Sequence, residues 1–121
     1  MVRFAGSHAF ASTPLTVLYL SASDCSNCRG WEQFHRPDFL KSAEGQQVPI
    51  REVSRVSLGA AVTTAQWPDD LKWVLAATTV PQATPAFVLI RGNQVMTTAW
   101  GASGFDRVIL PTIRQILAMS K

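Results

Sequence analysis

Apolar positions divide the chain into segments with strand-like and helix-like periodicity. Residues 15–20 (LTVLYL) form an apolar run, which is typical of a central strand covered on both faces. Imperfect alternation of apolar residues predicts a second strand over 48–56. Two further runs, 86–90 and 95–100, flank the Gly- and Asn-containing turn 91–94 and predict a β-hairpin. Strands that alternate with helices and end in a hairpin predict an α/β fold, with a central mixed sheet flanked by helices.

The first predicted helix follows the first strand. It begins near residue 25, where cap-type residues are concentrated, and its apolar positions recur at spacings of three and four. This spacing places Trp31 and Phe34 in the predicted core. Pro37 ends this helix and begins a short one, in which Phe39 and Leu40 are expected to face inward.

Weaker signals define the rest of the chain. Residues 44–47 read as a turn, and 67–77 read as a helix, since Trp-Pro-Asp-Asp is typical of a helix start. Loops are predicted over 78–84 and 101–104. The last helix is predicted over 105–119, and its proline, Pro111, is expected to bend it.

Composition limits the class of protein. With 121 residues and 47% apolar residues, the chain can bury a core, and we expect a single domain over 1–121. No apolar run approaches the roughly 20 residues of a membrane helix, so no membrane span is expected. The net charge of +3 comes from singly scattered basic residues, which argues against a nucleic-acid surface.

The amino terminus resembles two ends of a secretory signal without its apolar middle. Arg3 and the small residues of Ala9-Phe10-Ala11 fit those ends, whereas the intervening residues are too few and too polar. Residues 1–13 are therefore expected to be flexible or a leader remnant. The bacterial periplasm is favoured over the cytoplasm on this basis and on the resemblance given below.

The motif Cys25-Ser26-Asn27-Cys28 carries the chemistry. Cys25 at a helix N-terminus lies near unpaired backbone N–H groups and the positive end of the helix dipole, which favour the thiolate. Cys25 is therefore the predicted nucleophile at the surface, and Cys28, one turn further on, the buried resolving thiol. The negative charge of Asp24 opposes the thiolate unless its side chain points to solvent.

Other chemistries fit a CxxC pair as well. A four-ligand zinc site needs two more ligands, and only His8 and His35 are available as histidines. Cu(I) can accept two thiolates, and an inert structural disulfide is a third possibility. We expect no metal and no organic cofactor.

Thr84-Pro85 before the hairpin completes a resemblance to the thioredoxin fold. The order of elements and Gly101 after the last strand also match, so the resemblance covers roughly residues 15–117. The segment Cys28-Arg29-Gly30-Trp31-Glu32-Gln33-Phe34-His35-Arg36-Pro37-Asp38-Phe39 resembles the branch related to bacterial thiol:disulfide interchange proteins. The resemblance implies that Pro85 is cis and lies against the CxxC motif, and that Thr84 offers backbone groups to a peptide substrate. Ser26 and Asn27 are further expected substrate contacts.

The sequence departs from this family at several positions. The loop dipeptide Ser26-Asn27 is neither Gly-Pro nor Pro-Tyr, and the usual Trp beside the site is missing. Tyr19 stands where thioredoxins bury an acid, so the usual acceptor for the Cys28 proton is absent from that place. From this comparison, the amino-terminal portion of the fold is expected to be reduced.

Together these features favour a thiol:disulfide oxidoreductase. It is expected to act on protein disulfides as a monomer, in the reducing direction, with another dithiol protein as its redox partner. The alternatives are a non-catalytic thioredoxin-fold binding or chaperone module and a Cu(I)-binding protein. Trp67, Trp73 and Trp100 are expected to be packing residues, although an exposed tryptophan near the CxxC motif would be of interest.

Overall fold

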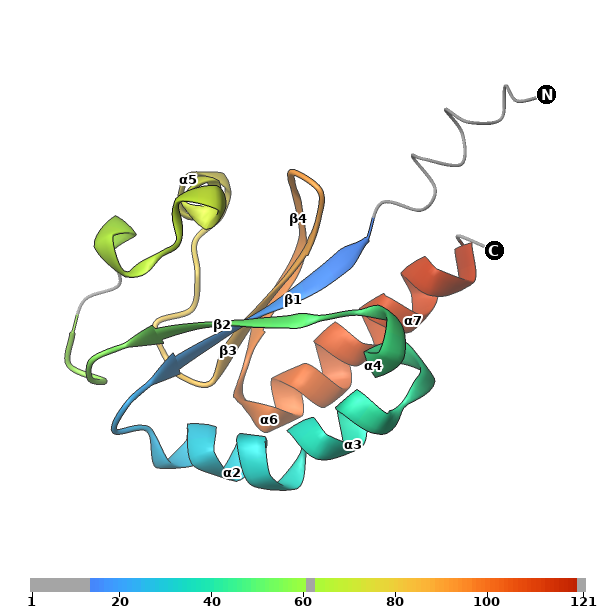
Figure 1. The fold of residues 1–121 in the computed structure, drawn as a ribbon, viewed down its shortest axis with the longest axis horizontal. Coiled ribbons are helices and arrows are strands. Elements are labelled where there is room, and N and C mark those ends of the chain that lie inside the picture. The colour runs from blue at the N-terminus through green and yellow to red at the C-terminus, as the bar shows by residue number, and fades with distance from the viewer. Residues whose placement is uncertain (1–13, 61–62, 120–121) are drawn as a thin grey trace.

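A four-stranded mixed sheet forms the centre of the computed structural model, which describes residues 14–60 and 63–119 (Figure 1). The strands lie in the order β2-β1-β3-β4. β1 pairs in parallel with β2 and antiparallel with β3, and β3 and β4 form the hairpin. Their bounds are β1 Leu15–Ala22, β2 Ile50–Arg55, β3 Ala86–Arg91 and β4 Gln94–Trp100. The predicted mixed sheet and its hairpin are thereby confirmed.

Helices cover both faces of this sheet. In Figure 1, α2, α3, α6 and α7 lie along one face, and α5 lies on the other. The α-helices are α2 Ser26–Phe34, α3 Arg36–Lys41, α4 Ala43–Gln47, α5 Trp73–Ala77, α6 Gly101–Gly104 and α7 Leu110–Met119. Two 3₁₀ turns, Thr64–Gln66 and Asp69–Leu71, precede α5, and a π-helical turn, Phe105–Ile109, joins α6 to α7.

Side chains of β1 alternate between two separate hydrophobic cores. Val17 and Tyr19 pack in the cluster under α2 and α7, whereas Leu18 and Leu20 pack in the cluster under α5. Successive residues of a strand point to opposite faces, so a strand covered on both sides is apolar throughout. This double burial explains the uninterrupted run of apolar residues in β1.

Two predicted loops are helical in the structure. The expected turn at 44–47 lies within α4, because the Ser42 hydroxyl caps this helix by accepting the Gly45 N–H at 3.0 Å. The expected loop at 101–104 is α6, whose first residue, Gly101, takes a positive φ of 79°. This short helix continues through the π-helical turn into α7, whose second residue is Pro111.

Two residues predicted to be buried are exposed. Phe34 is 68% exposed and Leu40 is 44% exposed, whereas Trp31 and Phe39 are buried as predicted. α2 ends at Phe34, and the chain changes direction at His35 before α3 begins. The helical stripe therefore does not extend to its last expected member, and Phe34 projects away from the core.

Within the described ranges, no helix is long and apolar enough to cross a membrane. The expectation for residues 1–13 falls outside the described residues.

Candidate functional site

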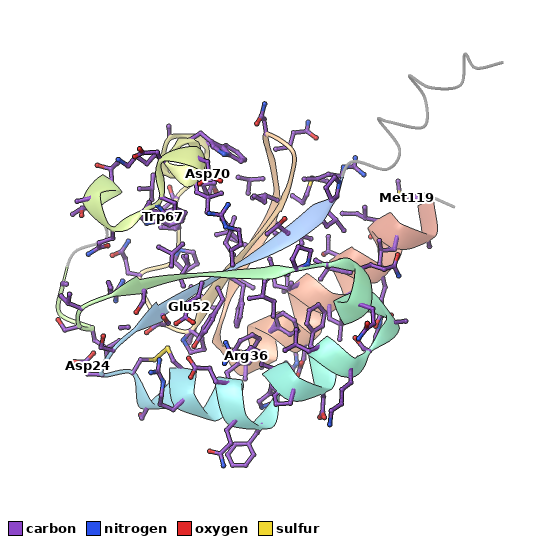
Figure 2. The ribbon with its side chains drawn as sticks, in the orientation of Figure 1. Asp24, Arg36, Glu52, Trp67, Asp70 and Met119 are labelled. Carbon is purple, nitrogen blue, oxygen red and sulfur yellow. A yellow bond between two sulfur atoms is a disulfide. The ribbon has the colours of Figure 1, made fainter. Side chains whose placement is uncertain are left out.

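The two cysteines lie where β1 passes into α2, and they are joined by a disulfide (Figure 2). Cys25 is the N-cap of α2, and its Sγ accepts the backbone N–H of Cys28 at 3.0 Å. Cys28 lies one turn further on and has no exposed surface. A sulfur that accepts a backbone N–H at a helix N-terminus is in an environment that favours negative charge. The predicted position of the pair at the start of a helix, with Cys28 buried one turn further on, is therefore confirmed.

Cys25 is less accessible than its sequence position suggests. We expected it at the surface, but the residue is only 3% exposed in this disulfide form. The hydroxyl of Thr84 lies against its sulfur and donates a hydrogen bond at 3.1 Å. The expected exposure of Cys25 is thus wrong for the oxidised protein, because Thr84 and the bond to Cys28 cover the sulfur.

Thr84 and Pro85 reach the disulfide from the loop before β3. The peptide bond between them is cis, the geometry that the resemblance implies. Pro85 is buried, and its carbonyl accepts the N–H of Gly101 at 2.7 Å, which joins this loop to the start of α6. The structure therefore brings together three segments that lie far apart in the sequence.

A groove of about 300 Å³ runs beside the CxxC motif between α2 and α6. Two large aromatic side chains on its lining are exposed: Phe34 at 68% and Trp100 at 62%. The expectation that both pack in the core is wrong. Trp100 is the last residue of an edge strand, and Phe34 is the last residue of α2. The groove is lined by Ser26, Asn27, Gly30, Trp31, Phe34, His35, Thr84, Pro85, Trp100, Gly101 and Ala102.

A polar network lies on the core side of Cys28. The Tyr19 hydroxyl donates to Glu32 Oε2 at 2.7 Å and lies 3.4 Å from the carbonyl oxygen of Cys28. The same carboxylate oxygen lies 3.1 Å from the guanidinium of Arg29. Burial, and then the bond to Glu32, raises the pKa of Tyr19 above its ordinary value, so its hydroxyl stays protonated and donates.

Sequence reasoning missed Glu32 as a member of this site. Its position four residues after Cys28, on the same face of a helix, is the signal that could have identified it.

Asp24 lies beside the disulfide, as the label in Figure 2 shows. Its carboxylate is exposed, but it does not project freely, because Oδ1 accepts the backbone N–H of Leu58 at 2.7 Å. The expected opposition between this charge and a thiolate is reduced by that bond and by solvent.

Among the described residues, no three His, Cys, Asp or Glu side chains gather where a metal ion could be held. His35 lies on the groove, 3.9 Å from Asp106.

Comparison with known proteins identifies the fold. No protein-family model matches the chain, and no curated protein matches its sequence. The periplasmic thioredoxin SoxS from Paracoccus pantotrophus, in its reduced form, is similar in structure, with a TM-score of 0.59 and 21% identity over 88% of this chain and 99% of that one.

Two further thioredoxins are similar at lower identity. Thioredoxin f from spinach chloroplast has a TM-score of 0.53 and 13% identity, covering 96% of this chain and 88% of its own. The thioredoxin of Malassezia sympodialis has a TM-score of 0.51 and 17% identity, covering 92% of this chain and 86% of its own. With its central mixed sheet flanked by helices and its CxxC pair at the start of α2, the chain has the thioredoxin fold.

Proposed function

We propose that this protein is a thiol:disulfide oxidoreductase that exchanges disulfides with protein substrates. The observation that carries the proposal is the Cys25–Cys28 pair at the N-terminus of α2, with the Thr84 hydroxyl hydrogen-bonded to Cys25 Sγ. A disulfide that serves only to stabilise a fold gains little from so short a loop, because it constrains few residues of the unfolded chain. The position of this pair at a helix start fits reactivity better.

In the reaction we propose, the reduced protein donates two electrons. The Cys25 thiolate attacks one sulfur of a substrate disulfide, which forms a mixed disulfide and releases the other substrate sulfur as a thiolate that takes up a proton. Cys28, once deprotonated, attacks Cys25 Sγ. This step closes the Cys25–Cys28 disulfide and releases the second substrate thiol. A dithiol partner protein then reduces the disulfide again.

Glu32 is our candidate acceptor for the Cys28 proton. Tyr19 cannot serve, because its raised pKa keeps it protonated. Its hydroxyl instead donates to Glu32 Oε2 at 2.7 Å and holds this carboxylate one helical turn after Cys28. The expected result of Glu32→Gln is a slower resolution step, by up to about 100-fold for a lost general base. Rapid-quench measurement of the mixed disulfide checks this, and a resolution rate equal to that of the wild type would contradict the assignment.

The groove beside the CxxC motif supports a proposal for the substrate's position. We propose that an extended polypeptide lies along Thr84 and Pro85, with apolar side chains against Phe34 and Trp100. Ser26 and Asn27 are exposed at the same groove and complete the contact. We also propose the reducing direction, because Ser26-Asn27 has no feature of a strong oxidant; potentials in this fold run from about −270 to about −120 mV.

Insulin reduction with a small dithiol as electron donor tests the proposal. The wild type should accelerate the reaction, Cys25→Ser should abolish it, and Cys28→Ser should accumulate a mixed disulfide that is visible on a non-reducing gel. No acceleration together with binding of unfolded substrates would indicate a non-catalytic binding module instead. Stoichiometric Cu(I) binding without exchange would indicate a copper protein.

A further inference from the structure

Arg55 is a buried cation at the end of β2. It is 8% exposed, and among the described residues it is the one charged residue that is buried. No carboxylate of the described residues pairs with it. Its guanidinium instead donates to three backbone carbonyls: those of Ser57 at 3.1 Å, Leu58 at 3.3 Å and Gln82 at 2.9 Å.

These bonds tie together two loops that flank the disulfide. Ser57 and Leu58 belong to the loop after β2, and Gln82 belongs to the loop that ends in Thr84 and Pro85. Gln82 lies two residues before Thr84, whose hydroxyl donates to Cys25 Sγ. One side chain therefore anchors the loop that delivers this hydroxyl to the reactive sulfur.

The loop between β1 and Cys25 is attached to the same residue. The carbonyl of Arg55 accepts the N–H of Ser23 at 3.1 Å and lies 3.5 Å from its hydroxyl, in the short loop between β1 and Cys25. Asp24 in that loop accepts the N–H of Leu58. The loop before Cys25, the loop after β2 and the loop that ends in Thr84 are thus all hydrogen-bonded to Arg55 or to a loop it holds.

The chemistry of the side chain suits this task. Burying a guanidinium without a carboxylate partner is costly, and it is tolerated where several polar groups accept its N–H donors. A planar fork with five donors can reach two loops at once, which the single ammonium of lysine cannot do in the same geometry.

If Arg55 only held the two loops together, its hydrogen bonds would not need to lead to Cys25. The chain of contacts from Arg55 through Gln82 and Thr84 ends on the sulfur itself. A hydroxyl that donates to sulfur stabilises the thiolate more than the neutral disulfide, because hydrogen bonds to charged acceptors are stronger. Anything that fixes this hydroxyl therefore favours the reduced, reactive form.

We propose that Arg55 is a positioning residue of the redox site: it holds the loop of Gln82 so that the Thr84 hydroxyl stays against Cys25. This inference rests on the proposed function for its biological meaning, although its test does not require turnover. Losing the hydroxyl's alignment lowers the reactivity of Cys25 and makes the disulfide harder to reduce.

The test is a double-mutant cycle of Arg55→Gln and Thr84→Val in the reduced protein. Arg55→Gln should slow alkylation of Cys25 about 3- to 10-fold, the worth of one hydrogen bond. It should shift the equilibrium with glutathione towards the disulfide by a similar factor, or about 15–30 mV. In the Thr84→Val background the same substitution should change neither quantity.

Arg51→Gln is the matched control. Arg51 lies on the same strand but is exposed and paired with Asp70, and its substitution should leave both quantities at the wild-type value. If Arg55→Gln does not fold, Arg55→Lys replaces it, with a smaller shift of the same sign expected.

Unchanged alkylation in Arg55→Gln would overturn the inference, as would an equal change in both backgrounds. A wild-type protein that fails in insulin reduction but shows the coupling would refute the proposed function alone. An active wild type without the coupling would refute this inference alone.

Discussion

Replacing Tyr19 with phenylalanine tests the network behind Cys28. The ring contacts would remain, because Tyr19 packs against Trp31 at 4.7 Å and Phe87 at 5.7 Å between ring centroids. The substitution removes only the hydroxyl that donates to Glu32 at 2.7 Å. The expected result is a lower free energy of unfolding at neutral pH.

The structure sets the size of this loss. A hydrogen bond to a charged group is worth about 1.5–3 kcal/mol. Glu32 retains its ion pair with Arg29, and its side chain is 19% exposed, so solvent replaces part of the lost bond. The loss should therefore lie near the lower end, at about 1.5–2 kcal/mol. At about 4 °C per kcal/mol for a domain of this size, Tm should fall by about 6–8 °C.

The pH dependence supplies an independent check. Burial, together with the bond to Glu32, raises the pKa of Tyr19 in the folded protein above the ordinary value of about 10. The contribution of this group to stability is therefore complete below about pH 10 and is lost as pH rises towards the folded pKa. For each pH unit above 10, the free energy of unfolding of the wild type should fall by up to about 1.4 kcal/mol more than that of the variant.

Urea unfolding of both proteins at pH 7 and at about pH 11 measures these quantities. Tyr19 is the only tyrosine in the sequence, so ultraviolet absorbance follows its ionisation directly. The stability gap at pH 7 should narrow at pH 11. Equal stabilities at pH 7, or a gap that does not change with pH, would refute this account of the network.

Two further predictions concern packing and the groove. Gly45→Ala should destabilise the protein by about 1–3 kcal/mol in thermal unfolding, because a Cβ there would overlap the carbonyl oxygen of Phe39. Gly30→Ala should instead stabilise it by about 0.5–1 kcal/mol, because there is open space around the added Cβ within a helix. Similar effects of the two changes would contradict this reasoning. Phe34→Ser and Trp100→Ser should leave stability within about 0.5 kcal/mol, since both side chains are exposed, yet raise KM for a disulfide-bearing protein about 3- to 10-fold. A large loss of stability with unchanged KM would show that these side chains pack rather than bind.

Local patterns predicted the sheet and the position of the CxxC motif well. The apolar run of β1 and the turn between β3 and β4, where Gly92 has a φ of 60°, are determined by residues adjacent in sequence. The start of a helix near residue 25 follows from the same kind of local signal, although the cap itself is Cys25 and not a preferred cap residue.

Features that depend on the exact end of an element were not predictable. Phe34 continues the spacing of Trp31, but α2 stops there and His35 takes a φ of −119°, so the stripe ends early. The turn at 44–47 is short and polar, and only the cap by Ser42 makes it helical. Periodicity carries no information about either event.

The burial of Arg55 could not be predicted from the sequence either. Its partners are the carbonyl groups of Ser57, Leu58 and Gln82, and every residue type carries a carbonyl. A buried arginine of this kind leaves no complementary charge in the sequence to reveal it. The partnership of Tyr19 and Glu32 crosses thirteen positions between a strand and a helix, and it likewise required the fold.

The order of the strands has a consequence for synthesis on the ribosome. Of the described strands, β1 is made first but lies between β2 and β3, so its two edges remain unpaired until synthesis reaches Ile50 and then Ala86. Cys25 and Cys28 emerge with that first strand, well before Thr84 can cover the sulfur. The nascent chain therefore carries a dithiol that Thr84 does not yet cover while the segment between Cys28 and Thr84 is made. A premature stop before the hairpin would release that dithiol with no loop to shield it.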